Sequence, residues 1–148
     1  MKKGLLALAT SSLLIVSCSS MKNKAVAQTD KAQIAALAGT WELDVIPYSK
    51  GPFDSLYKDK KPTLTFEPEK KSFYGYTGCN GLNGPLDTDG HKINFKGDIT
   101  MTLKACFGDG ESVFMENLKR INQYSVSTDG KELTLIQGDI ALMRFHRK

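Results

Sequence analysis

The sequence predicts a mainly β domain in which one antiparallel, curled sheet or barrel carries one amphipathic helix packed on it. Three observations favour this fold class. Apolar and polar residues alternate with a period of two in short segments, turn dipeptides such as Asp89-Gly90 and Asp129-Gly130 separate these segments, and only one long segment has a helical period. The chain has 148 residues, of which 41% are hydrophobic, and this fits one globular domain.

The first residues have the pattern of an export signal. Met1-Lys2-Lys3 is a basic start, and the apolar and small residues from Gly4 to Ser17 form a run that is too short to cross a bilayer comfortably. The motif Ile15-Val16-Ser17 directly before Cys18 resembles the bacterial lipoprotein signal, in which cleavage precedes a lipidated cysteine. We therefore expect a signal peptide over residues 1–17 and lipidation of Cys18.

The residues after Cys18 are small and polar, so we expect a lipidated, flexible tether over residues 18–33 that leads into a domain over residues 34–148. Neither an Asp nor an acidic cluster follows Cys18. In families with such signals these features direct inner-membrane retention or surface display, so we expect the periplasmic face of the outer membrane. Removing Lys2 and Lys3 with the signal lowers the net charge from +4 to +2, which gives no reason to expect a nucleic-acid partner.

The domain is expected to begin with a short helix, capped at Thr29-Asp30 and continuing to Leu37. The long helical pattern begins near Asp109-Gly110 and ends near Ile121, with apolar residues on one side. The alternating segments predict strands at residues 41–45, 63–67, 72–76, 91–95, 99–103, 124–127, 133–136 and 140–145.

The segment 78–84 is the most unusual one, because five of its seven residues are Gly or Asn, which tolerate positive φ. We favour a tightly folded corner whose Asn side chains bond the local backbone. The alternative is a binding loop in which successive N–H groups form an anion-binding nest. The candidate residues are Gly78, Cys79, Asn80, Gly81, Asn83 and Gly84.

Cys79 and Cys106 remain once Cys18 is lipidated. In an exported domain they are candidates for a disulfide, which would close a loop of about 28 residues and stabilise the fold by roughly 3.5 kcal/mol. Two buried free thiols and a redox pair are the alternatives, and the lack of Cys-x-x-Cys spacing disfavours the redox pair. Two distant cysteines with His91 and His146 show no ligand spacing, so we expect neither a metal nor a cofactor.

Several segments together resemble the META domain of HslJ-like heat-shock lipoproteins, over residues Ile34–Lys148. The specific part is a Gly-Cys-Asn loop combined with a later Met-x-x-x-Ala-Cys motif, and the start Gly39-Thr40-Trp41 agrees with it. The matching segments are Leu37–Leu43, Pro62–Phe66, Gly75–Asn80, Met101–Cys106, Glu111–Leu118 and the last two predicted strands.

The resemblance implies a lipocalin-like β barrel with a helix packed on it, in a family of heat-inducible envelope proteins without an established catalytic mechanism. It also implies that Gly39 and Trp41 are fold signatures, as are Gly78, Cys79, Asn80 and Cys106. The stretch Tyr48–Lys61 departs from the pattern.

We therefore expect a monomeric, lipid-anchored envelope protein that is not an enzyme. Its expected role is envelope or heat-shock stress tolerance through binding of a protein or an envelope component. The alternative is a lipocalin-type carrier of a small apolar ligand, since lipocalins also begin with a short helix and Gly-x-Trp and enclose an apolar cavity. The Gly/Asn-rich loop and the position of the long helix disfavour that alternative.

Overall fold

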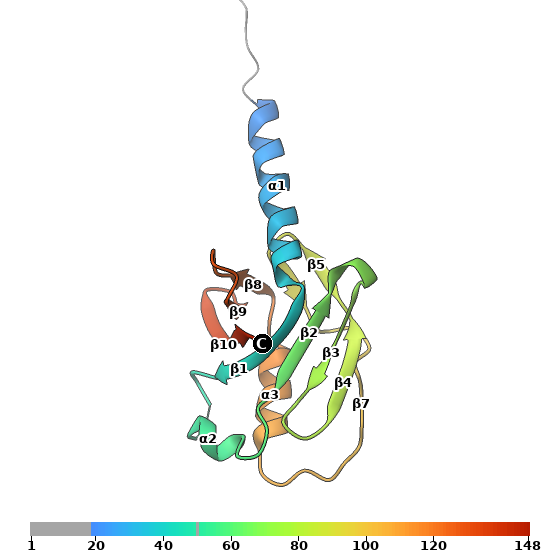
Figure 1. Ribbon diagram of the computed structural model, residues 1–148, viewed down its shortest axis with the longest axis vertical. Helices are drawn as coiled ribbons and strands as arrows, with labels where there is room; N and C mark the ends of the chain where they lie inside the picture. Colours follow the sequence, from blue (N-terminus) through green and yellow to red (C-terminus); the bar gives the residue numbers. More distant parts are fainter. Residues whose placement is uncertain (1–18, 50) are drawn as a thin grey trace, which may run out of the picture.

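Ten antiparallel strands form one curled sheet in the computed structural model, which describes residues 19–49 and 51–148 (Figure 1). The predicted signal peptide and Cys18 lie outside the described residues. The strands are β1 (Gly39–Val45), β2 (Thr63–Glu67), β3 (Ser72–Tyr76), β4 (Gly81–Pro85), β5 (Asp87–Asp89), β6 (Lys92–Asn94), β7 (Thr100–Met101), β8 (Gln123–Val126), β9 (Glu132–Gln137) and β10 (Ile140–Arg147).

The order across the sheet is β5-β6-β8-β9-β10-β1-β2-β3-β4-β7, so most strands pair with their neighbours in the sequence. The predicted fold class is confirmed, and β2 and β3 have the expected bounds. β7 is shorter than the predicted strand at residues 99–103. The reason is that the Asn80 side chain accepts the Lys104 N–H at 2.8 Å, a group that a longer strand would offer to its neighbour.

The helix α3 (Gly110–Leu118) lies inside the curl of the sheet and supplies the centre of the core (Figure 1). Its Phe114 and Leu118 side chains have no exposed surface, because the apolar side of the predicted helix faces the sheet. Three phenylalanine rings fill the neighbouring space at centroid separations of 5.1 to 6.3 Å: Phe66, Phe73 and Phe95. Such aromatic packing occupies the part of the interior in which a lipocalin would hold its ligand.

The helix α1 (Ser19–Leu37) corrects two predictions, namely the flexible tether over residues 18–33 and the cap at Thr29-Asp30. The helix begins at Ser19, and Thr29 and Asp30 lie within it. Its sequence contains no Gly or Pro and is rich in Ala, Lys and Gln, which favour helix. The tether was predicted from the polar composition of these residues, without considering their helix propensity.

The C-terminal part of α1 docks on the sheet, whereas its first turns project away from it (Figure 1). The Gln33 Oε1 atom accepts the Val126 N–H at 3.3 Å, and the Trp41 Nε1 donates to the Leu37 carbonyl at 2.8 Å. The same end of the helix contacts the 3₁₀ helix η1 (Pro68–Lys70). No helix among the described residues combines the length and the apolar character needed to cross a bilayer.

The stretch Tyr48–Lys61 contains the short helix α2 (Phe53–Leu56), which was not predicted. Tyr57 follows it and is buried, and its hydroxyl donates to the Gly110 carbonyl at 2.8 Å. The segment therefore joins the connection between β1 and β2 to the start of α3.

Candidate functional site

A cluster of polar and sulfur-containing side chains lies at the end of the sheet opposite α1. It joins the turn between β3 and β4 to the loop between β7 and α3 (Figure 1). We call it the Asn80 cluster and define it as Thr77, Cys79, Asn80, Cys106 and Glu111. Cys79, Asn80 and Cys106 were predicted as site residues from the sequence, whereas Thr77 and Glu111 were not.

The first link in the Asn80 cluster is covalent. Cys79 and Cys106 form a disulfide with an Sγ–Sγ distance of 1.97 Å and a Cα–Cα distance of 5.9 Å. The sequence left open a disulfide, two buried free thiols or a redox pair, and in the structure the two cysteines form a disulfide. Both cysteines are partly exposed, so the bond is accessible from solvent.

The Asn80 side chain is the hub of the cluster, although only 2% of the residue is exposed. Its Oδ1 atom accepts hydrogen bonds from the Lys104 N–H at 2.8 Å and the Thr102 hydroxyl at 2.7 Å. Its Nδ2 atom donates to the Lys104 carbonyl at 3.2 Å, to Glu111 Oε1 at 3.1 Å and toward Cys106 Sγ at 3.1 Å. The prediction was a corner whose Asn side chains bond the local backbone, whereas the oxygen and nitrogen partners of the Asn80 side chain lie more than 20 residues away, in the loop after β7 and on α3.

The Glu111 carboxylate occupies the place where the sequence predicted an anion nest as an alternative. Its Oε2 atom accepts the Asn80 N–H at 3.2 Å and also the Thr77 hydroxyl, while the Cys79 N–H donates to Thr77 Oγ1 at 3.3 Å. Its Oε1 atom lies 3.4 Å from Cys106 Sγ. Among the described residues no Lys or Arg forms an ion pair with Glu111, so neutral donors and the first turn of α3 alone compensate its charge.

The tight turn is shorter than the predicted corner over residues 78–84. Gly78 has φ +100°, and a Cβ there would lie 2.9 Å from the Tyr57 ring, so both backbone conformation and space favour glycine. Gly81 and Gly84 belong to β4 instead. Asn83 is exposed on that strand and accepts a hydrogen bond from the Thr100 hydroxyl at 2.9 Å.

Tyr57 lies beside the Asn80 cluster and was not predicted from the sequence as a residue of the site. Its ring packs beside Gly78 and Gly110, and burial raises the pKa of its hydroxyl well above the ordinary value. No local motif marks this tyrosine, since its position depends on how the connection between β1 and β2 folds back.

The two histidines lie elsewhere. His146 is on β10, with its Nδ1 atom 2.7 Å from Asp44 Oδ1, and His91 stands between β5 and β6, 3.9 Å from Asp30. Neither forms a hydrogen bond with the Asn80 cluster. Asp87–Asp89 forms β5, and Gly90 and His91 form the hairpin turn between β5 and β6, next to the Asp89-Gly90 dipeptide that predicted it.

Three side chains of the cluster are of the kinds that bind metals. The Sγ atoms of Cys79 and Cys106 and a carboxylate oxygen of Glu111 all lie within 4.8 Å of one another. Sequence spacing gave no reason to expect a metal site, because the fold brings Glu111 to the cysteines from a separate helix.

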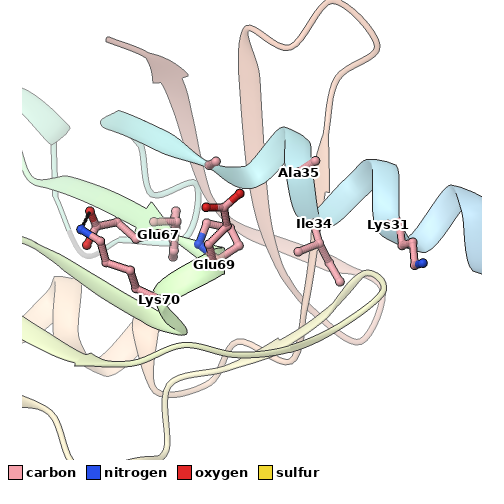
Figure 2. Close-up of a pocket in the computed structure, with 9 residues that line it drawn as sticks. Lys31, Ile34, Ala35, Glu67, Glu69 and Lys70 are labelled. Atoms are coloured by element: carbon pink, nitrogen blue, oxygen red, sulfur yellow. Dashed lines mark hydrogen bonds and ion pairs between the residues drawn. The ribbon is translucent and has the colours of Figure 1, made fainter.

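A second feature is an apolar groove of about 570 Å³ between α1 and η1 (Figure 2). Charged residues stand along it, and the Lys70 Nζ atom is 2.7 Å from Glu67 Oε1. The residues that line it are Lys31, Ile34, Ala35, Ala38, Phe66, Glu67, Pro68, Glu69 and Lys70. The apolar spacing of Ile34, Ala35 and Ala38 was the one sequence signal for it.

A third feature is the loop between β7 and α3, which carries Cys106. Leu103 and Phe107 in this loop are 97% and 102% exposed, and they are the most exposed large apolar residues among those described. The disulfide fixes the loop between them to the turn at Cys79.

Comparisons with known proteins agree with this architecture. A family model of the META domain matches residues 32–148. A protein from Burkholderia xenovorans with an NMR structure is similar at 19% identity and a TM-score of 0.61, over 100% of this chain and 99% of that one. Another NMR structure is similar at 18% identity and a TM-score of 0.55, over 80% of this chain and 94% of that one.

These similarities concern the fold alone at such identities. A crystal structure of a DUF4847 family protein from Bacteroides vulgatus is also similar, at 17% identity and a TM-score of 0.49, over 76% of this chain and 94% of that one. A search of the curated proteins finds no match to this chain.

Proposed function

The chain belongs to the META domain family, and from this premise we propose that it is a lipid-anchored protein of the bacterial cell envelope that acts by binding. One observation carries the proposal. The lipoprotein-type motif Ile15–Cys18 stands directly before Ser19, the first residue of α1. Cleavage before Cys18 would leave the lipid at the start of a helix about 28 Å long, which would separate the domain from the membrane surface.

The geometry supports a role in contact with a protein partner. An anchor at the start of α1 would place the Asn80 cluster and the loop with Leu103 and Phe107 on the side away from the membrane (Figure 1). A disulfide holds this loop in place, so binding of a partner to the two apolar side chains would cost little further conformational entropy of the loop. The proposed role is envelope or heat-shock stress tolerance at the periplasmic face of the outer membrane, by a monomer without catalytic activity.

The anchor is tested by separating the membranes of cells that produce Cys18→Ala. We expect this variant to leave the outer-membrane fraction, whereas the neighbouring control Ser19→Ala stays there, because only Cys18 carries the lipid. An unchanged outer-membrane share for Cys18→Ala would contradict the proposal.

The binding role is tested in a strain that lacks the protein. A double variant with Leu103→Ser and Phe107→Ser should fail to restore survival after a heat pulse, while its level and melting temperature match the wild type. The control is Tyr48→Ser, since Tyr48 is also exposed, at 71%, but lies outside this loop. Full restoration of survival by the double variant would show that this loop is not the contact surface.

The apolar groove favours a second candidate function, the carrier of a small apolar ligand. Its volume of about 570 Å³ lies within the usual range for ligand sites. Because Phe66, Phe73 and Phe95 fill the neighbouring interior, a ligand would lie in the external groove instead of inside the barrel.

A fluorescent fatty acid tests this candidate. Saturable micromolar binding should weaken at least tenfold in Ala35→Arg, which fills the groove. The matched control is Ala32→Arg, because Ala32 is also exposed on α1 but does not line the groove. Absence of saturable binding, or equal loss in both variants, would argue against a carrier.

A further inference from the structure

We propose that Cys79, Cys106 and Glu111 form a redox-gated zinc site, which binds Zn²⁺ when the disulfide is reduced. This goes beyond the proposed binding role and does not depend on it. Thiolate and carboxylate are both ordinary zinc ligands, and three protein ligands with a water in the fourth position make an open site. The ligand atoms of these three residues already lie within 4.8 Å of one another.

The carboxylate has the separation from sulfur that such a site needs. With Zn–S near 2.3 Å and Zn–O near 2.1 Å, tetrahedral geometry places oxygen about 3.6 Å from sulfur. The observed distance from Glu111 Oε1 to Cys106 Sγ is 3.4 Å. The two sulfurs must move apart to about 3.8 Å, and cleavage of the bond between them allows this movement.

The surrounding hydrogen bonds give the two oxygens of Glu111 different tasks. Oε2 is held by the Asn80 N–H and the Thr77 hydroxyl, so it fixes the carboxylate in place. Oε1 is directed toward the sulfurs, and the Asn80 amide donates both to it and toward Cys106 Sγ. Partners of this kind orient metal ligands and are a regular part of metal sites.

The negative charge of the reduced cluster explains why zinc binding depends on the redox state of the two cysteines. A dithiol reductant transfers two electrons and two protons to the disulfide, which becomes two thiols while the reductant becomes a disulfide. Binding of Zn²⁺ then displaces both thiol protons to solvent. The two thiolates and Glu111 would place three negative charges together, and no Lys or Arg pairs with Glu111 among the described residues. A divalent cation relieves that repulsion, whereas the oxidised pair offers no thiolate to hold it.

The test uses the full chain with Cys18→Ser, so that only the two cluster cysteines remain as thiols. The protein is reduced with a phosphine, which does not add competing thiols, and is titrated with Co²⁺ as a spectroscopic substitute for Zn²⁺. We expect a sulfur-to-cobalt charge-transfer band that saturates at one ion per chain, no band in the oxidised protein, and displacement of Co²⁺ by Zn²⁺.

A matched pair of variants on α3 tests the third ligand. Glu111→Gln should weaken binding at least tenfold, whereas Glu116→Gln, which changes an exposed carboxylate of the same helix, should not. Absence of the band in the reduced chain would overturn the proposal, and so would equal affinity in Glu111→Gln and the unsubstituted chain.

X-ray absorption of the zinc-loaded, reduced chain keeps the test independent of whether Glu111→Gln folds. We expect two sulfur ligands near 2.3 Å and two oxygen or nitrogen ligands near 2.1 Å. A shell of four sulfurs, or one without sulfur, would overturn the proposal.

Discussion

Asn80 is the residue that decides the structure of the site, because its side chain satisfies polar groups of the loop after β7 and of α3 while being almost fully buried. Removal of a buried hydrogen-bonding partner costs the desolvation free energy of each group left unpaired, about 1–3 kcal/mol. A single short side chain therefore holds two loops at fixed positions.

We predict that Asn80→Ala lowers the free energy of unfolding by about 3 kcal/mol, since the Lys104 N–H and the Glu111 carboxylate lose partners. Asn83→Ala is the matched control, because Asn83 is exposed three residues later, and it should change stability by less than about 0.5 kcal/mol. Urea denaturation measures both. Equal effects of the two variants would show that burial of Asn80 is unimportant.

Tyr124 gives stability a dependence on alkaline pH. Burial and the nearby Asp30 carboxylate raise its pKa to about 12, compared with about 10 in an unfolded chain. The folded state therefore keeps a proton that the unfolded state loses. The stabilisation is complete below pH about 10 and is lost as the pH rises toward about 12.

We predict that the unfolding free energy of Tyr124→Phe falls less steeply between pH 10 and 12 than that of the wild type, because the variant lacks the phenol that titrates. Tyr74→Phe, which changes a tyrosine that is 48% exposed, should keep the wild-type slope. Denaturant titrations at several pH values measure the slopes, and a wild-type slope in Tyr124→Phe would contradict this assignment.

At the residue scale, the sequence predicted the glycines, the cysteines and Asn80 as residues of the site, but not the side chains that reach them from distant segments. The Gly-Cys-Asn motif indicated the turn, since positive φ at Gly78 is a local requirement. Tyr57 and Glu111 reach the site through the path of distant segments, and no local spacing encodes that path.

At the scale of elements, the disulfide ties the β3–β4 turn to the loop before α3. We predict that the double variant Cys79→Ser, Cys106→Ser lowers the free energy of unfolding by about 3.5 kcal/mol, because the unfolded chain regains the entropy of a loop of about 28 residues. Chemical denaturation of the oxidised wild type and of this variant measures the difference. Adding a phosphine should bring the wild type to the level of the variant, and equal stability with and without reductant would contradict the prediction.

The end of α1 is held by the C-terminal strand. Arg147 donates to the carbonyls of Ala36 and Ala38, both at 2.7 Å, and its guanidinium lies 4.1 Å from the centre of the Trp41 ring. The planar guanidinium caps the helix and stacks on the ring at the same time.

We predict that Arg147→Ala lowers the free energy of unfolding by roughly 1–2 kcal/mol, and that Arg147→Lys recovers little of it because an ammonium cannot make both contacts. Arg144→Ala on the same strand is the control, because the Arg144 side chain forms no hydrogen bond or ion pair within the described part of the chain, and this variant should be nearly neutral. Thermal unfolding measures all three. Full recovery in Arg147→Lys would show that charge alone is important.

Strands were predicted better than the first helix, and the reason is physical. Alternation of apolar residues is imposed by a sheet with one buried face, so β2 and β3 were placed to the residue. The polar first turns of α1 carry no such pattern, and helix propensity alone indicates their state. β7 is short because Asn80 captures backbone groups, a tertiary effect.

At the scale of the whole molecule, α1 and the Asn80 cluster lie at opposite ends of the sheet (Figure 1). Because of this arrangement, a lipid at Cys18 would direct the exposed loop with Leu103 and Phe107 away from the membrane. The apolar groove would lie on the membrane side, where the C-terminal end of α1 meets η1.

The central claim is that the chain is processed and lipidated at Cys18, and intact-mass spectrometry of the protein purified from the cell envelope tests it most directly. We predict a mature chain that begins at Cys18 and carries the added mass of a diacylglyceryl group and further acyl chain, all located on its N-terminal peptide. An N-terminus at any other residue, or an unmodified Cys18, would contradict the claim.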